Sequence, residues 1–127
     1  IDLGIGRFPV TTEAEAKILV DKTVDYMENK YAGSWRNVIC VMGDDGDNND
    51  HIGKAELIAK QVEEEHASMQ VNRIYWDAYK REAGASGYSY PAVTADIKQQ
   101  MEEGCLVMNY SGHGNPRELS HELVLKM

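Results

Sequence analysis

The chain has 127 residues, of which 13 are Lys or Arg and 21 are Asp or Glu, so its formal net charge is −8. This length corresponds to one ordinary domain, and 43% apolar residues suffice for a hydrophobic core. No apolar run reaches the roughly 20 residues of a membrane-spanning helix. An acidic chain of this kind also lacks the clustered Lys and Arg that bind nucleic-acid phosphates. Composition therefore excludes a disordered tail, a membrane-spanning protein and a nucleic-acid partner.

The first third of the chain predicts a short strand followed by a helix. Residues 2–6 (DLGIG) are the strand candidate. Thr12 and Glu15 have the spacing of a capping box, which begins a helix. Gly33 and Ser34 are expected to end it. One helical stripe lies between these limits and comprises Ala16, Leu19, Val20, Thr23, Val24, Met27 and Tyr31.

The middle of the chain predicts two strands on either side of a helix. Residues 38–42 (VICVM) form a continuous apolar run, which is typical of a strand covered on both faces. Residues 71–76 (VNRIYW) are the next strand, and residues 77–92 form a long irregular connection. Between the strands, a polar loop (GDDGDNND) precedes a helix marked by Ala55, Ile58, Ala59, Val62 and Met69.

The last third predicts a helix, a strand and a final helix. Thr94 is expected to cap a helix that ends at Gly104 and turns Ile97 and Met101 inward. CLVMNY at 105–110 is the fourth strand. The loop SGHGNPR then precedes an amphipathic helical segment, ELSHELVLKM.

Four strands that alternate with helices specify an α/β fold with a mainly parallel sheet. The chain begins with Ile1 and ends inside a predicted helix, so we expect it to be a fragment of a longer chain. Ligands of an open parallel sheet bind beyond the carboxyl ends of its strands. Those ends carry Arg7, residues 44–50, Trp76 with Asp77, and residues 111–114.

His113 stands between two glycines directly after the fourth predicted strand. Gly112 and Gly114 allow a tight turn and bring backbone N–H groups next to the imidazole. An imidazole that titrates near neutrality is a natural general base, and an adjacent N–H can stabilise an oxyanion. A histidine that merely sits in a glycine-rich turn is the alternative. The strand-end position favours the catalytic hypothesis.

The sequence offers His113 no nucleophile. Ser111 does not fit the Gly-x-Ser-x-Gly elbow, because positions 109 and 113 are Asn and His. Cys105 stands at the start of the strand that leads to His113, about 16 Å away along the strand. Cys40 lies inside the apolar strand VICVM. We expect both thiols to be small buried hydrophobes without a disulfide, and the nucleophile to lie outside the chain.

The loop that follows the second predicted strand carries four carboxylates, those of Asp44, Asp45, Asp47 and Asp50. Oxygen-rich loops suit Ca²⁺ or Mg²⁺, although the EF-hand spacing and its closing Glu are absent. A non-catalytic module that binds a divalent ion such as Ca²⁺ is therefore the alternative function. The loop is otherwise interpreted as a solvated turn without a functional role. A phosphorylation-switch receiver domain is a weaker alternative. It requires a Lys at the end of a late strand, and none stands at the predicted strand ends.

Several segments resemble the gingipain family of cysteine peptidases, which are caspase-like α/β proteins. They are DLGIGRFPVTT, YPAVTADI and above all GCLVMNYSGHG, and they follow the family's order over nearly the whole chain. GDDGD and SHELVLKM look more like the sortase of the type IX secretion system than like the digestive gingipains. The resemblance implies a three-layer α/β/α sandwich with a mainly parallel sheet. Residues 1–127 would be part of a single peptidase domain, truncated at its C-terminal end.

The resemblance also implies the chemistry. His113 would be the histidine of a His–Cys dyad, Gly114 would offer its N–H to the oxyanion, and the cysteine would lie beyond Met127, so the chain alone would be inactive. The intact protein would cleave peptide bonds of secreted protein cargo without a cofactor. It would work outside the cell or at a bacterial outer-membrane surface, beside other outer-membrane components of the secretion system. Asp77 is either a carboxylate that selects the P1 side chain or a strand-end cap.

Overall fold

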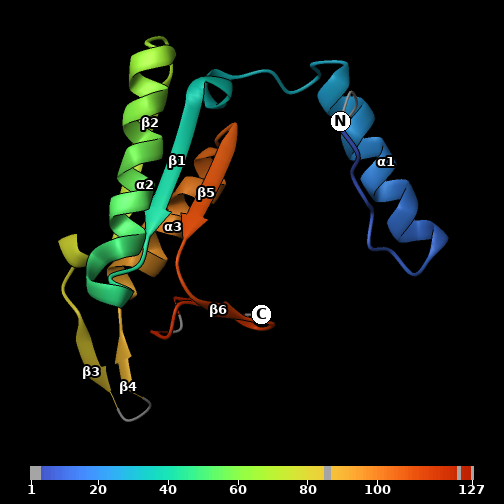
Figure 1. Cartoon of the computed structure of the whole chain (residues 1–127). Helices are drawn as coiled ribbons and strands as arrows, with labels where there is room; N and C mark the ends of the chain where they lie inside the picture. The colour runs from blue at the N-terminus through green and yellow to red at the C-terminus, as the bar shows by residue number, and fades with distance from the viewer. Residues whose placement is uncertain (1–3, 85–86, 123, 127) are drawn as a thin grey trace. The chain divides into compact units, whose positions relative to one another are not determined.

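The computed structural model describes residues 4–84, 87–122 and 124–126, and the chain divides into two compact units, residues 1–33 and 34–127 (Figure 1). The expectation that both belong to one peptidase domain stays a prediction. No helix among the described residues combines the length and the apolar character of a membrane span.

The first unit contains helix α1, Glu13–Met27. The predicted capping box is confirmed, because the Thr12 hydroxyl accepts from the Glu15 N–H and the Glu15 carboxylate accepts from the Thr12 N–H. The helix ends six residues before Gly33, since Asn29 takes a left-handed conformation with φ 60°. Its apolar stripe forms but contains no buried residue.

The strand predicted at residues 2–6 is wrong for residues 4–6. Residues 4–6 have no regular secondary structure, and residues 2 and 3 lie outside the described residues. A strand requires a neighbour that accepts and donates along its edge. The described residues of this unit provide no such partner, so the short apolar pattern does not become a strand.

The second unit begins with a parallel three-stranded sheet in the order β2-β1-β5. The central strand β1 (Val38–Gly43) pairs with β2 (Gln70–Tyr75) on one side and with β5 (Val107–Ser111) on the other. The remaining elements are the 3₁₀ turns Ser34–Asn37 and Trp76–Ala78, helices α2 (Gly46–Glu65) and α3 (Pro91–Glu103), the hairpin β3 (Glu82–Gly84) and β4 (Gly87–Ser89), and the meander β6 (Gly114–Asn115), β7 (Glu118–Leu119) and β8 (Leu125–Lys126).

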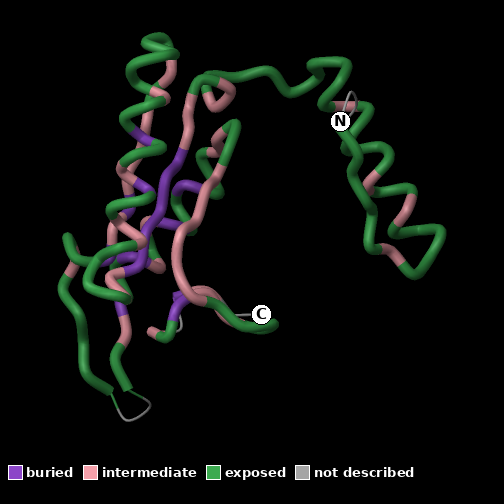
Figure 2. Tube along the Cα trace, in the orientation of Figure 1, coloured by how far each residue is buried: buried purple, intermediate pink, exposed green. Residues whose placement is uncertain are grey.

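Two helices cover opposite faces of this sheet, which confirms the predicted α/β/α layering. Successive side chains of a strand point to opposite faces, and β1 shows this directly. Val41 packs with Ala55 and Ala59 of α2. Cys40 and Met42 belong to the other cluster, which the α3 residues Val93 and Ile97 share. All of β1 from Cys40 to Gly43 is buried (Figure 2), as its continuous apolar run predicts.

Helix α3 begins earlier than predicted. Its N-cap position is Tyr90 and Pro91 follows, so Thr94 lies inside the first turns instead of capping them. The predicted end at Gly104 is confirmed, with φ 84°. The inward position predicted for Met101 is wrong, because Gln100 is buried in its place and accepts from the Asn72 amide at 2.6 Å.

The helix predicted for ELSHELVLKM is wrong, because the described part of this segment is a short antiparallel meander. Ser120 takes a left-handed conformation with φ 64°, which turns the chain after β7. Val124 is then buried against the α3 side of the sheet, and its carbonyl accepts from the Thr94 hydroxyl at 2.8 Å. Tertiary packing therefore overrides the local helical pattern.

Candidate functional site

The loops that follow β1 and β5 begin side by side at the carboxyl edge of the sheet. Gly43 is in register with Ser111, and the next N–H, that of Asp44, donates to the Ser111 carbonyl at 3.2 Å. From β1 the chain first goes to β2 on one side and later returns to β5 on the other side. Such a reversal of strand order opens a crevice beyond the strand ends, which is where open α/β sheets bind ligands.

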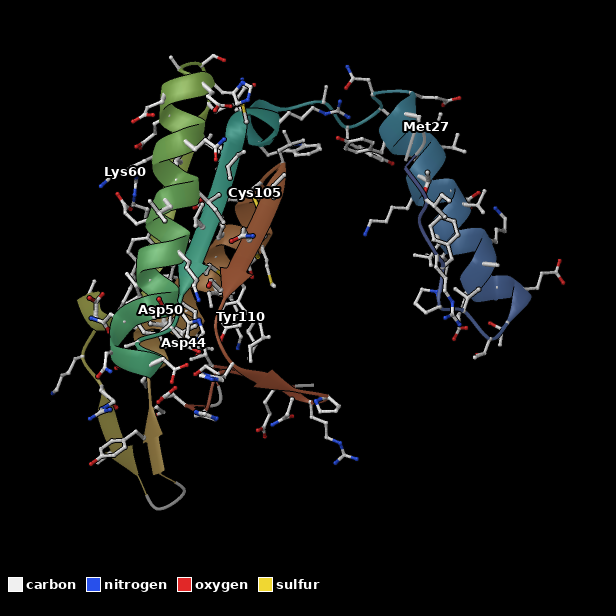
Figure 3. The ribbon with its side chains drawn as sticks, viewed as in Figure 1. Met27, Asp44, Asp50, Lys60, Cys105 and Tyr110 are labelled. Atoms are coloured by element: carbon white, nitrogen blue, oxygen red, sulfur yellow. The ribbon has the colours of Figure 1, made fainter. Side chains whose placement is uncertain are left out.

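Asp44 is the central buried group of this edge, with 2% of the residue exposed. Its Oδ1 accepts from the Gly46 N–H at 2.9 Å, and its Oδ2 accepts from the His113 N–H at 2.8 Å. The Tyr110 hydroxyl lies 2.9 Å from the same Oδ2 and 2.7 Å from the His113 carbonyl oxygen. Asp44 thus joins the loop after β1 to the loop after β5. Figure 3 shows Asp44 and Tyr110 close together at this end.

Tyr110 acts here as a hydrogen-bond donor. Burial, together with the hydrogen bond to Asp44, raises the pKa of the Tyr110 hydroxyl well above its ordinary value. The hydroxyl therefore stays protonated at neutral pH. Its single proton is shared between the Asp44 carboxylate and the His113 carbonyl oxygen.

Two glycines make room for this arrangement. A Cβ added at Gly112 would overlap the Tyr110 hydroxyl and the Asp44 carboxylate. A Cβ added at Gly46 would lie 2.9 Å from Asp44 Oδ1 and 3.3 Å from His113 Nδ1. Gly112 is therefore required for space, since it does not have the positive φ of a left-handed turn. Gly114 begins β6 and pairs with Leu119.

The imidazole of His113 is half-buried among polar and aromatic neighbours. Its side chain is 39% exposed, and its Nε2 lies 3.4 Å from Asp47 Oδ2. The His121 ring stacks on it with centroids 5.0 Å apart, and the His51 ring meets it edge-on at 4.8 Å. His113 therefore faces the acidic loop at the same edge of the sheet, as the sequence predicts for parallel strands.

The acidic loop is a left-handed turn that aims Asp47 at two histidines. Asp47, Asn48 and Asn49 have φ of 52°, 57° and 65°, and right-handed helix follows them. Asp and Asn tolerate this conformation better than most residues. The turn places Asp47 Oδ2 3.4 Å from the Nε2 of both His51 and His113.

The four predicted carboxylates do not converge on one point. The Asp44 carboxylate is held by the contacts above, while Asp45 accepts from the Tyr90 hydroxyl at 2.5 Å. Asp50 pairs with Lys54 at 2.5 Å on the exposed side of α2. The described group whose ligand atoms lie close enough to share an ion consists of Asp44, His51 and His113.

Sequence reasoning missed His51. It is the last residue of the acidic loop, it lies in the first turn of the right-handed part of α2, and its side chain is only 16% exposed. Its place beyond the carboxyl end of β1 was the available signal.

Of the other strand-end candidates, Asp77 is exposed and accepts from the Asn49 amide at 3.4 Å, and Arg7 is an exposed residue of the first unit.

Neither cysteine of the chain can serve His113. Cys40 is fully buried inside β1, and burial raises the pKa of its thiol to about 11. Cys105 precedes β5 at the edge opposite Asp44 and Tyr110 (Figure 3), and burial raises the pKa of its thiol as well. Both are free thiols in this structure. The expected burial is confirmed for Cys40, whereas Cys105 is only partly buried.

The fold and this edge define a class: an α/β/α domain whose polar residues gather around a half-exposed histidine at the switch point of a parallel sheet. The chain belongs to peptidase family C25, the gingipain family, whose model matches residues 1–127. Comparison with curated proteins and comparison with solved structures each found no match. Family membership confirms the resemblance at the level of the family. It implies cysteine-peptidase activity of the intact protein on protein or peptide substrates.

Proposed function

We propose that this chain carries the general-base half of a cysteine peptidase, with His113 as the base and the nucleophilic cysteine supplied by polypeptide outside residues 1–127. The observation that carries the proposal is the position of His113 at the carboxyl end of β5, beside the loop that follows β1. The second half of the proposal is supported by the positions of the two thiols, because Cys40 is fully buried and Cys105 lies at the opposite edge of the sheet.

The surroundings of His113 suit a base that becomes charged during the reaction. The exposed part of the ring leaves a path for a thiol. The Asp47 carboxylate, 3.4 Å from Nε2, favours the imidazolium that forms when the ring takes a proton. Asp44 fixes the backbone of the same residue through its N–H. Asp44 and Asp47 are therefore positioning residues, which act through His113.

The reaction then follows ordinary cysteine-peptidase chemistry. His113 removes the proton of the thiol, and the thiolate attacks the peptide carbonyl carbon. The Gly114 N–H stabilises the oxyanion. The carbon–nitrogen bond breaks, the imidazolium returns its proton to the leaving amine, and a thioester remains on the enzyme. Water hydrolyses the thioester in a peptidase, whereas an amine accepts the acyl group in a transpeptidase.

We further propose that the intact protein works as a sortase on secreted cargo, at the outer-membrane surface or outside the cell, beside other components of a type IX secretion system. The support is the segment GDDGD, whose last residue Asp47 begins the left-handed turn beside His113, together with SHELVLKM. Asp77 would select the P1 side chain. It is exposed at the carboxyl end of β2 and shares a hydrogen bond with the same turn.

The test is cargo processing by the intact protein with His113→Ala, compared with His66→Ala. His66 is an exposed histidine at the far end of α2, so it controls for loss of an imidazole as such. Loss of a general base typically lowers the rate by about 10²–10⁴-fold. We expect that loss for His113→Ala and the parent rate for His66→Ala. Cargo processing that survives His113→Ala would refute the proposed role.

A further inference from the structure

Three potential metal ligands from different parts of the chain meet at the carboxyl edge of the sheet. Asp44 directly follows β1, His51 lies in the first turn of the right-handed part of α2, and His113 follows β5. One ligand atom from each lies within 4.8 Å of the others. The group is held in place by the buried Asp44 carboxylate, so it belongs to the fold and not to a loose surface loop.

Two imidazole nitrogens of this group are buried without a hydrogen-bond partner. They are Nε2 of His51 and Nδ1 of His113. Buried polar atoms in native proteins are nearly always paired, and each exception requires an explanation. His51 Nε2 lies 3.4 Å from Asp47 Oδ2 without the alignment of a hydrogen bond. A bound cation would satisfy the lone pairs of both nitrogens.

The spacing of the donor atoms fits a small ion. Ligands of a tetrahedral Zn²⁺ ion, bound at about 2.1 Å, are about 3.4 Å from one another. Asp47 Oδ2 is 3.4 Å from Nε2 of His51, one of the two unpaired nitrogens. Asp44 Oδ1 accepts one hydrogen bond, so it retains a lone pair for an ion. Side-chain movements of about an ångström would bring the remaining donor atoms to bonding distance from one ion.

The donor set selects the class of ion. Imidazole nitrogens suit zinc, copper, iron and nickel, whereas Ca²⁺ and Mg²⁺ require six or more oxygen ligands. The predicted oxygen-only set would have suited Ca²⁺, but its four carboxylates point to different partners. The two carboxylates that remain near the histidines, Asp44 and Asp47, balance a divalent charge.

We propose that Asp44, His51 and His113 bind a divalent transition-metal ion of the Zn²⁺ type, with Asp47 as a further ligand. The site includes the imidazole that the proposed peptidase mechanism uses as its base. A nitrogen lone pair that binds a metal ion cannot take the proton of a thiol. Metal binding therefore switches the enzyme off, a consequence that rests on the proposed function, whereas the binding site does not.

The direct test is calorimetric titration of the chain with ZnCl₂ in a buffer free of chelators. We compare the parent, His51→Ala and the matched control His66→Ala, and circular dichroism checks that each is folded. Removal of a ligand should cost more than the about 10–100-fold in affinity that is lost with an outer-shell partner. We expect one Zn²⁺ per parent chain, at least tenfold weaker binding to His51→Ala, and unchanged binding to His66→Ala.

The thiols should not contribute to Zn²⁺ binding at this site, because Cys40 is buried and Cys105 lies at the opposite edge of the sheet. Co²⁺ as a second probe should give a spectrum without thiolate charge-transfer bands. CaCl₂ under the same conditions should give no comparable heat. Absence of Zn²⁺ binding, or equal binding by His51→Ala and His66→Ala, would overturn the site.

A separate measurement on the intact protein tests the consequence. ZnCl₂ should suppress cleavage of a peptide substrate in the parent, a chelator should restore it, and His51→Ala should need at least tenfold more Zn²⁺ for the same inhibition. An intact protein that binds Zn²⁺ but never cleaves peptides would refute the proposed function alone. One that cleaves peptides but does not bind Zn²⁺ through His51 would refute the metal site alone.

Discussion

Replacement of Asp44 tests whether one buried carboxylate holds the candidate site together. Asp44→Ala removes the acceptor of the Gly46 N–H and of the His113 N–H, while the Tyr110 hydroxyl keeps the His113 carbonyl at 2.7 Å. Hydrogen bonds to a charged group contribute about 1.5–3 kcal/mol each. Relief of the buried charge offsets part of that loss. We expect a net loss of about 3–5 kcal/mol in the free energy of unfolding.

The assay is urea unfolding followed by circular dichroism at neutral pH. A domain of this size is stable by only about 5–15 kcal/mol, so the expected loss is a large shift of the midpoint. Asp44→Asn should be almost as destabilised, because its amide NH₂ group would face an N–H or hydroxyl donor. Asp50→Ala is the matched control, since its carboxylate pairs with Lys54 on the exposed side of α2 and should matter little.

The result that would refute this reasoning is equal midpoints for Asp44→Ala and Asp50→Ala. The loops after β1 and β5 would then be held by their backbones alone, through contacts such as the Asp44 N–H to the Ser111 carbonyl. A changed m-value with an unchanged midpoint would instead indicate a change in the surface exposed on unfolding.

Two further stability predictions concern the packing of α2 on the sheet. Gly43→Ala should lower the free energy of unfolding by about 1–3 kcal/mol, because its Cβ would lie 2.9 Å from Ile52 Cα. Gly53→Ala is the control, because a Cβ at Gly53 would meet open space and should not destabilise the fold. Equal urea midpoints for the two variants would contradict the predicted clash. Arg73 lowers the pKa of Glu56, so their pair stabilises the fold above the unfolded carboxyl pKa of about 4.3 and loses effect as pH falls. Glu56→Gln should therefore unfold more easily than the parent at pH 7, by about 1 kcal/mol, and equally at pH 2–3 in thermal melts; a difference that persists in acid would refute the linkage.

Local sequence was sufficient where an element's pattern agreed with its surroundings. The capping box of Thr12 and Glu15 specified the start of α1, since both hydrogen bonds of that motif lie within four residues. The apolar run at 38–42 specified a strand buried on both faces, because only the centre of an α/β/α sandwich accommodates it. Parallel pairing then placed residues 44–50 and 111–114 at one edge of the sheet.

Local pattern failed where packing between distant segments decided the outcome. The segment after Glu118 has helical periodicity, yet it forms a meander because Val124 is buried against α3. Gln100 occupies the inward position expected of Met101, because the Asn72 amide on β2 provides it with a hydrogen-bond partner. Neither contact is visible in a window of neighbouring residues.

The sequence by itself therefore determined the alternation of strands and helices, the histidine between glycines, and the edge at which it lies. Only the tertiary structure decided which carboxylates meet that histidine: Asp44 binds its N–H, Asp47 approaches its ring, and His51 joins them. The physical reason is that periodicity fixes the face of an element on which a side chain stands. The loops that meet at this site are 60 or more residues apart in the chain, and the distances between their side chains depend on strand register. They also depend on single residues, such as those of the left-handed turn at 47–49 and Gly112, which has no Cβ.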